Sequence, residues 1–266
     1  LREIVPQGYC VLAGPPKLGK TWLCYQLAHA VAAGGALFGQ DAQRAPVLML
    51  ALEDGERRAQ DRLRKVLGGA PMPAGLEIAF DWPRLDGGGA DAIGEWAAGK
   101  PGGLVLVDTL AKVKPPASRG ANAYDADNAV HGPLHKLCRD KGITVVSVTH
   151  LKKGGAGSDD FAEGITGSMG IAGTADTIVV LKRKRGEADG FLHVTGRDVA
   201  EQELALRFDK EGGRWSCLGD AAAHRATENT RSVLGALKPG GTAGLTPNEV
   251  ADRTGINRGT VKSLLF

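Results

Sequence analysis

A short stretch near the start of the chain limits the possible folds more than any other feature. It reads Gly14-Pro15-Pro16-Lys17-Leu18-Gly19-Lys20-Thr21 and contains every required position of a phosphate-binding loop. An apolar run over 9–13 precedes it, and an apolar-rich helical pattern over 22–28 follows it. This order of strand, loop and helix directs backbone N–H groups and a helix N-terminus at a polyphosphate. We therefore expect a nucleoside triphosphate site here, rather than a glycine-rich turn without function.

Individual residues of this loop have distinct expected roles. The Lys20 ammonium is expected to reach the β- and γ-phosphates, and the Thr21 hydroxyl to ligate Mg²⁺. Pro15 and Pro16 have no backbone N–H, so fewer amides can face the phosphates. Lys17 adds a positive charge beside the site. All eight residues from Gly14 to Thr21, including Leu18 and Gly19, are candidate nucleotide contacts.

Apolar runs alternate with helical patterns along most of the chain. Strands are predicted over 8–13, 47–52, 76–80, 104–107 and 143–148. Helices are predicted over about 20–33, 55–67, 89–98 and 124–140. Shorter strands follow over 177–181, 191–194 and 204–208. The alternation predicts an α/β fold with a doubly wound, mainly parallel sheet, and the later strands predict an antiparallel extension.

Acidic side chains follow two of the predicted strands. Asp108 comes directly after the strand over 104–107, where it can hold Mg²⁺ through water. Thr109 follows it, so no second acid is available there, and Glu53 can instead polarise the attacking water. Asp54 is a near-equal candidate by position, although capping of the next helix is the role we expect for it.

His150 ends the strand predicted over 143–149. A polar side chain at this strand end can contact the γ-phosphate; the alternative is an ordinary surface histidine. The carboxyl ends of parallel strands open toward one edge of a sheet. We therefore expect His150 to converge there with Lys20, Thr21, Glu53 and Asp108.

This combination resembles the RecA-like ring ATPases, in particular the hexameric replicative helicases of the RepA and DnaB type. The resemblance covers roughly residues 1–215. The other matching stretches run from Glu53-Asp54 to Arg62-Leu63, over 149–153, at Gly167-Ser168, and over 175–177 and 196–198.

The resemblance implies ATP and Mg²⁺ as cofactors and hydrolysis at the interfaces of a homo-oligomeric, hexameric ring. Arg197 matches the basic finger that a neighbouring subunit inserts, and Arg62 is a second candidate nucleotide contact. The pore loops that grip single-stranded DNA would correspond to about 112–123 and 152–166. Their basic residues are Lys112, Lys114, Arg119, Lys152 and Lys153.

The leading hypothesis is therefore a ring-forming ATPase motor on single-stranded DNA, a replicative helicase of phage or plasmid type. One alternative is an ATP-gated DNA-binding or regulatory protein. Another is a recombinase or loader that assembles on DNA without unwinding it.

The end of the chain has a different character. The net charge of the chain is +3, and residues 223–266 hold six Lys or Arg against three acids. We expect an ATPase domain over 1–217, a linker over 218–227, and an incomplete helix-turn-helix or winged-helix-like module over 228–266. A capping box at Thr246-Pro247-Asn248-Glu249 predicts the start of one of its helices.

In this module the candidate DNA contacts are Asn257, Arg258, Thr260 and Lys262. The partner would be duplex DNA or, alternatively, replication proteins that dock on the helices. The four cysteines are scattered, and no apolar run approaches the length of about 18–20 residues that spans a membrane. These features favour a cytoplasmic protein.

Overall fold

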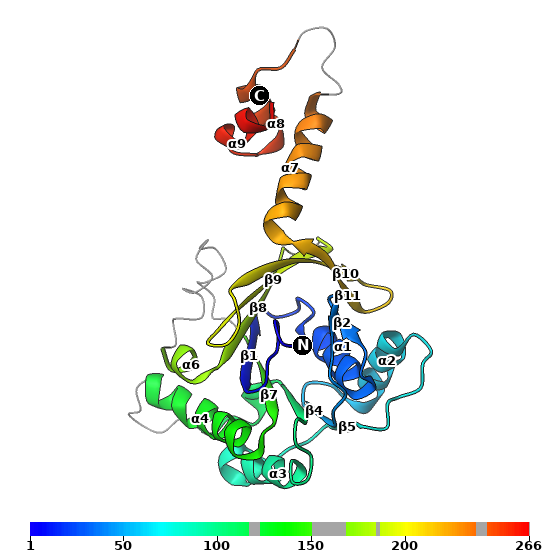
Figure 1. The fold of residues 1–266 in the computed structure, drawn as a ribbon, viewed down its shortest axis with the longest axis vertical. Coiled ribbons are helices and arrows are strands. Elements are labelled where there is room, and N and C mark those ends of the chain that lie inside the picture. The colour runs from blue at the N-terminus through cyan, green and yellow to red at the C-terminus, as the bar shows by residue number, and fades with distance from the viewer. Residues whose placement is uncertain (117–122, 151–168, 185–186, 238–243, 266) are drawn as a thin grey trace. The chain divides into compact units, whose positions relative to one another are not determined.

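The computed structural model describes residues 1–116, 123–150, 169–184, 187–237 and 244–265 (Figure 1). The chain divides into two compact units, Leu1–Cys217 and Leu218–Phe266. Within the described residues, no helix is both long and apolar enough to cross a lipid bilayer.

A nine-stranded sheet forms the centre of the first unit, in the order β11-β10-β9-β8-β1-β7-β6-β4-β5. Its strands are β1 (Tyr9–Gly14), β4 (Val47–Ala51), β5 (Leu76–Ala79), β6 (Leu104–Asp108), β7 (Thr144–His150), β8 (Thr177–Arg183), β9 (Asp189–Gly196), β10 (Gln202–Asp209) and β11 (Arg214–Asp220). The strands from β8 to β5 pair in parallel, whereas β9 is antiparallel to β8 and β10 to β9. The predicted parallel sheet with an antiparallel extension is confirmed.

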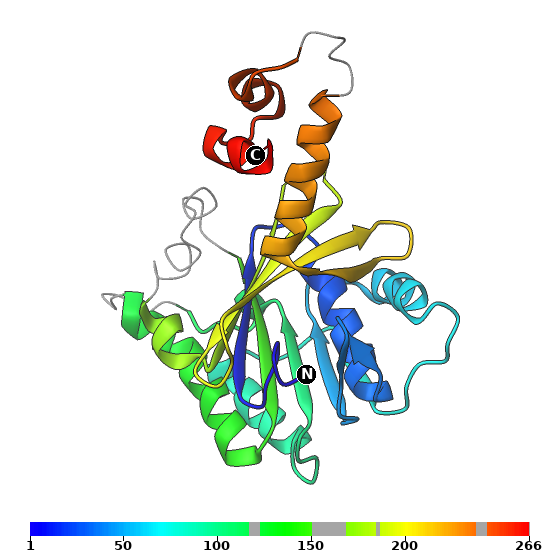
Figure 2. The ribbon, with the colours of Figure 1, turned by 45° about the horizontal axis from the view of Figure 1, so that its top comes forward.

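Helices cover both faces of the parallel part (Figure 2). One face carries α1 (Lys20–Ala33) and α2 (Glu56–Leu67), and the other carries α3 (Gly89–Trp96) and α4 (Ala123–Lys141). The shorter elements are α6 (Met169–Thr174), the 3₁₀ turns η1 (Leu85–Gly87) and η2 (Leu110–Lys112), and the hairpin of β2 (Ala36–Leu37) and β3 (Gln40–Asp41). This doubly wound arrangement leaves the carboxyl ends of the parallel strands free to carry a site.

Alternation along the buried strands explains the two layers of core. In β1, Cys10 and Leu12 pack on the side of α1, while Tyr9 and Val11 pack on the side of α4. Successive side chains of a strand point to opposite faces, so a strand covered on both faces must be apolar at every position. That requirement accounts for the continuous apolar runs by which the strands were predicted.

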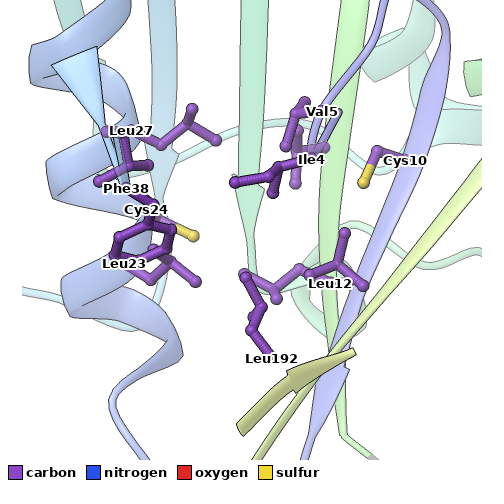
Figure 3. A pocket seen from close by; sticks show the side chains of 12 residues that line it. Ile4, Val5, Cys10, Leu12, Leu23, Cys24, Leu27, Phe38 and Leu192 are labelled. Atoms are coloured by element: carbon purple, nitrogen blue, oxygen red, sulfur yellow. The ribbon is translucent and has the colours of Figure 1, made fainter. Parts of the chain in front are cut away.

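A small apolar cavity lies between α1 and the sheet (Figure 3). Cys10 and Cys24 are among its lining residues, together with Ile4, Leu12 and Leu192. Burial raises the pKa of both thiols. Because the thiolate is the reactive form, these two cysteines are chemically inert components of the core.

The prediction of a linker over 218–227 is wrong, because these residues belong to a strand and a helix. Residues 218–220 complete β11, and α7 (Ala221–Leu237) begins directly after it. Alanine is the best helix former, and the carboxylate of Asp220 accepts a hydrogen bond from the Ala223 N–H at 2.9 Å. The alanines at 221–223 therefore start a helix instead of forming a linker.

The second unit also contains α8 (Pro247–Thr254) and α9 (Arg258–Leu265). The predicted capping box is present, because the Glu249 N–H donates to Thr246 Oγ1 and the Thr246 N–H donates to Glu249 Oε2. Val233, Val250 and Val261, one from each helix, are buried together.

A buried polar contact joins β1, β7 and α4 on the side of the parallel sheet that α4 covers. The Tyr9 hydroxyl lies 2.5 Å from Nδ1 of His131 on α4 and 2.7 Å from Oγ of Ser147 on β7. Burial lowers the pKa of His131 to about 4, so its ring is neutral at pH 7 and one nitrogen can accept a hydrogen bond. The contact thus satisfies three polar side chains in an otherwise apolar layer.

We expect Tyr9→Phe to destabilise the protein by about 1–3 kcal/mol, because it leaves buried partners without a hydrogen bond. Urea denaturation measures the change. Ser147→Ala is the second single variant of a double-mutant cycle. The loss of stability in the double variant should be smaller than the sum of the two single losses, because both residues belong to one contact. Unchanged stability of Tyr9→Phe, or additive losses, would contradict this account.

Candidate nucleotide-binding site

The loop between β1 and α1 has a backbone that few residues can adopt. Gly14 and Gly19 have φ values of 155° and 102°, and Lys17 is left-handed at 65°. A Cβ on Gly14 would lie 2.4 Å from the carbonyl oxygen of Leu181 on β8. The glycine at this position is therefore required by the close approach of two strands as well as by its dihedral angle.

Lys20 is buried at the start of α1, with 4% of its surface exposed. Its Nζ donates to the carbonyl oxygens of Gly14 at 2.6 Å and Pro15 at 2.8 Å. Burial lowers the pKa of Lys20 to about 8, while the nearby Asp108 carboxylate opposes that shift. The ammonium group lies inside the loop, where a phosphate group would meet it.

The acid at the end of β6 lies next to the same helix. Asp108 is 3% exposed, and the Thr21 hydroxyl hydrogen-bonds to it. Burial raises the pKa of Asp108 to about 6, the Thr21 hydrogen bond opposes this shift, and Glu53 adds to it. A hydroxyl and a carboxylate in contact form a pair of hard oxygen donors, the type that Mg²⁺ prefers.

Glu53 and His150 complete the edge of the site. His150 Nδ1 lies 3.2 Å from Lys20 Nζ, and its Nε2 lies 3.9 Å from a carboxylate oxygen of Glu53. The side chains of Glu53 and His150 are both 41% exposed. The structure thus brings Lys20, Thr21, Glu53, Asp108 and His150 to one edge, with Glu53 open to solvent where a water could be activated.

Asp54 does not cap α2 as expected. Gly55 is the N-cap, and Asp54 is buried, accepting hydrogen bonds from the Tyr25 hydroxyl at 3.1 Å and Arg62 Nη1 at 2.6 Å. The guanidinium of Arg62 also lies 5.2 Å from the ring centre of Trp22. Asp54 and Arg62 therefore hold the loop after β4 against α1 and α2, because a buried carboxylate is stabilised by a charged partner.

Trp215 on β11 borders the phosphate loop and was not identified from the sequence. Its indole N–H donates to the Gly19 carbonyl at 3.1 Å. Its backbone N–H donates to Gln26 Oε1 at 2.6 Å, and Gln26 Nε2 returns a hydrogen bond to its carbonyl at 3.0 Å. The guanidinium of Arg183, at the end of β8, lies 5.4 Å from the indole ring centre. The antiparallel extension therefore helps to hold the loop in place.

Arg197 lies away from this edge. It follows β9, whose Gly196 pairs with Thr177, and Thr177 in turn pairs with Cys10 near the start of β1. Gly14 comes four positions after Cys10, a distance of about 13 Å along a strand. Arg197 is thus near the amino end of β1, whereas the phosphate loop leaves its carboxyl end.

Asp176 anchors Arg197 at that end of the sheet. Arg197 Nη1 lies 3.6 Å from Asp176 Oδ1, and Nη2 donates to the Gly173 carbonyl at 2.7 Å. The same carboxylate accepts the Tyr9 N–H at 2.9 Å and lies 3.4 Å from Nε2 of His135. The Arg197 side chain is nevertheless 55% exposed, so it remains accessible to another molecule.

Only some of the residues predicted to contact single-stranded DNA lie in the described part of the chain. Lys112, in η2, and Lys114 are exposed shortly after Asp108. Arg119, Lys152 and Lys153 lie outside the described residues. In the second unit Arg258, Thr260 and Lys262 are exposed, and Asn257 accepts a hydrogen bond from the Gly259 N–H at 2.8 Å.

The fold and this loop define a RecA-like P-loop ATPase. The sequence profile of an AAA-domain family matches residues 2–156, and the chain belongs to that family. No match was found among curated proteins.

Solved structures of other proteins share the fold, and two of them align with the same TM-score. One, described as an ATPase domain, aligns with a TM-score of 0.62 at 17% identity, covering 80% of this chain and 86% of that chain. The other, a DnaB-like replicative helicase described with its interactions with primase, aligns with a TM-score of 0.62 at 16% identity and the same 80% coverage of this chain. This chain spans 59% of that helicase chain.

The lowered pKa of Lys20 predicts how nucleotide binding depends on pH. Only the protonated ammonium attracts phosphate, and in the free protein it loses its proton near pH 8. Binding of an ATP analogue without Mg²⁺ should therefore weaken above pH 8, by up to about tenfold per pH unit. Fluorescence titration measures the affinity.

Lys20→Arg is the control, because a guanidinium stays charged in this range. Its affinity should be lower than that of the unsubstituted protein at neutral pH. It should then stay constant from about pH 7 to about pH 9.5, because arginine loses its proton only above about pH 12. An equally flat profile for the unsubstituted protein would contradict a lowered pKa at Lys20.

Proposed function

We propose that this ATPase is a ring-forming, Mg²⁺-dependent motor that acts on single-stranded DNA, as a cytoplasmic replicative helicase of phage or plasmid type. The observation that carries the proposal is the separation of Arg197 from the nucleotide loop of its own chain. Because Arg197 is exposed and anchored at the opposite end of β1, we infer that it contacts the nucleotide of a neighbouring subunit rather than that of its own chain. Hydrolysis between subunits requires an assembly, and a hexameric ring is the one we propose.

In this proposal each strand end supplies one part of the reaction. Lys20 would bind the β- and γ-phosphates, and Thr21 and Asp108 would hold Mg²⁺, which would supply positive charge against that of the phosphates. Glu53 orients and deprotonates the attacking water. His150 lies between Lys20 and Glu53. In that position it can contact the γ-phosphate, and this contact is lost when the γ-phosphate is released.

The proposed DNA contacts connect directly to this chemistry. Lys112 and Lys114 are exposed on the segment that leaves β6 after Asp108. Positive charges suit binding to a sugar–phosphate backbone without recognition of sequence. Arg119, Lys152 and Lys153 belong to the same proposal. The match to a DnaB-like replicative helicase supports a helicase among the motors that share this fold.

Two assays test the motor. ATP turnover should rise when single-stranded DNA is added, and a forked duplex should be unwound in an ATP-dependent reaction. Glu53→Gln should retain ATP binding and lose turnover by at least about a hundredfold, because it removes the general base. The double variant Lys112→Ala/Lys114→Ala should lose the stimulation by DNA but keep basal turnover, whereas Lys136→Ala on α4 should keep both.

A rate of ATP turnover that does not change when single-stranded DNA is added would contradict the proposed motor function. DNA-stimulated turnover without unwinding would favour the alternative of a recombinase or loader. Electron microscopy would then separate closed rings from open filaments.

Mixed assemblies test the role of Arg197. Arg197→Ala and Glu53→Gln should each be inactive alone, because each removes one half of every intersubunit site. Mixing them forms some interfaces that combine an intact Glu53 with an intact Arg197, so part of the turnover should return. Arg197→Lys is a further control that keeps the charge but not the planar guanidinium. No recovery in mixtures that demonstrably co-assemble would contradict a finger acting across subunits.

A further inference from the structure

The second unit, Leu218–Phe266, lies outside the residues matched by the AAA-domain family and takes no part in the proposed ATPase chemistry. Its helices α7, α8 and α9 contact one another around a small core (Figure 1). Val261 of α9 is fully buried in that core, and Leu265 packs against it. These two residues define the inner side of α9 and therefore which of its residues face outward.

The connection between α8 and α9 is short and well defined. Gly255 ends α8 with φ of 70°, and its N–H donates to the Ala251 carbonyl at 2.8 Å. Asn257 then starts α9, because its Oδ1 accepts the Gly259 N–H at 2.8 Å. A short turn that contains a glycine, between two packed helices, is the geometry of a helix-turn-helix, in which the second helix enters the major groove of DNA.

The outward side of α9 suits a nucleic acid. Its exposed residues are Arg258, Gly259, Thr260, Lys262, Ser263 and Leu264. Two of these are basic and none is acidic, and glycine, threonine and serine leave room for the helix backbone to approach a groove. The exposed apolar residue, Leu264, lies in the last turn, whereas the first residues of such a helix contact the bases.

One acid lies near this surface. Arg258 Nη2 is 3.7 Å from Asp252 on α8, and the two side chains are 65% and 72% exposed. An exposed ion pair of this kind contributes little free energy, so Arg258 can exchange the carboxylate for a phosphate. Lys262 lies one turn further along α9, at the spacing that places both cations on one side of the helix.

We propose that α8 and α9 form a second DNA-binding site, specific for duplex DNA and separate from the ATPase site. Arg258 and Lys262 contact backbone phosphates, and Thr260 reaches base edges in the major groove. The side-chain oxygen of Asn257 caps α9, as its position before the helix predicts, and thereby fixes where the recognition helix begins.

The experiment uses the full chain and a labelled random-sequence duplex of about 30 base pairs, roughly three helical turns. Unlabelled single-stranded oligothymidine is added in excess to occupy the single-strand contacts. Binding is measured by fluorescence anisotropy over a range of salt concentrations. All chains carry Lys20→Ala, so the result does not depend on nucleotide binding or on the proposed motor.

Replacement of two phosphate contacts, in Arg258→Ala/Lys262→Ala, should reduce the slope of log affinity against log salt by about 2. At the lowest salt concentration the affinity should fall at least about tenfold. The matched control is Arg64→Ala/Arg231→Ala, which removes two exposed cations elsewhere and should leave the slope unchanged. Arg258→Lys/Lys262→Arg keeps both charges and should retain the slope, which attributes the change in slope to the lost charges. A far-UV circular dichroism spectrum of the alanine variant that matches the parent excludes misfolding as the cause.

Three results would overturn the proposal. They are no duplex binding by the parent chain, the same salt slope in the α9 variant as in the parent, or an equal loss in the control variant. The first of these would leave α9 as a surface for protein docking. Failure of the ATPase or unwinding assays would leave this result untouched, because the two sites are tested independently.

Discussion

Parallel pairing of β1 on both sides is the constraint on which the ATPase unit depends. Gly14 is level with His150 on β7, and Cys10 is level with Thr177 on β8. The phosphate loop leaves the carboxyl end of β1, and Asp176 accepts the Tyr9 N–H at its amino end. Because one strand carries both contacts, the nucleotide loop and the anchor of the proposed finger are positioned by the same backbone hydrogen bonds.

The site combines charges that burial disfavours. Lys20 and Asp108 are both almost fully buried. Burial lowers the pKa of Lys20 and raises the pKa of Asp108, so it favours the neutral form of each group. The Asp108 carboxylate partly offsets the cost of burying Lys20, and the Thr21 hydroxyl and the Arg62 guanidinium partly offset that of burying Asp108. A polyphosphate with its metal ion would add the charges that complete the compensation. A folded protein that holds such a pair gives up some stability for binding, as sites of this kind generally do.

Local patterns predicted much of the fold and the centre of the site. The apolar runs identified the parallel strands because both faces of the sheet are covered, and the capping box identified the start of α8 because its contacts lie within four residues. Asp108 and His150 were found because they end such runs. By contrast, β11 has few apolar residues and was not predicted, and the residues after Asp220 were assigned to a linker, although their alanines favour a helix.

The sequence by itself determined that the chain has a phosphate loop, and which acids and histidine can lie beside it, since these follow from the order of strands and from local geometry. Only the tertiary structure decided that Asp54 binds Arg62 and Tyr25, that Trp215 supports Gly19, and at which end of the sheet Arg197 lies. Those contacts join residues that are far apart in the chain or depend on which strands become neighbours. Strand order and packing decide such contacts, and no local pattern contains that information.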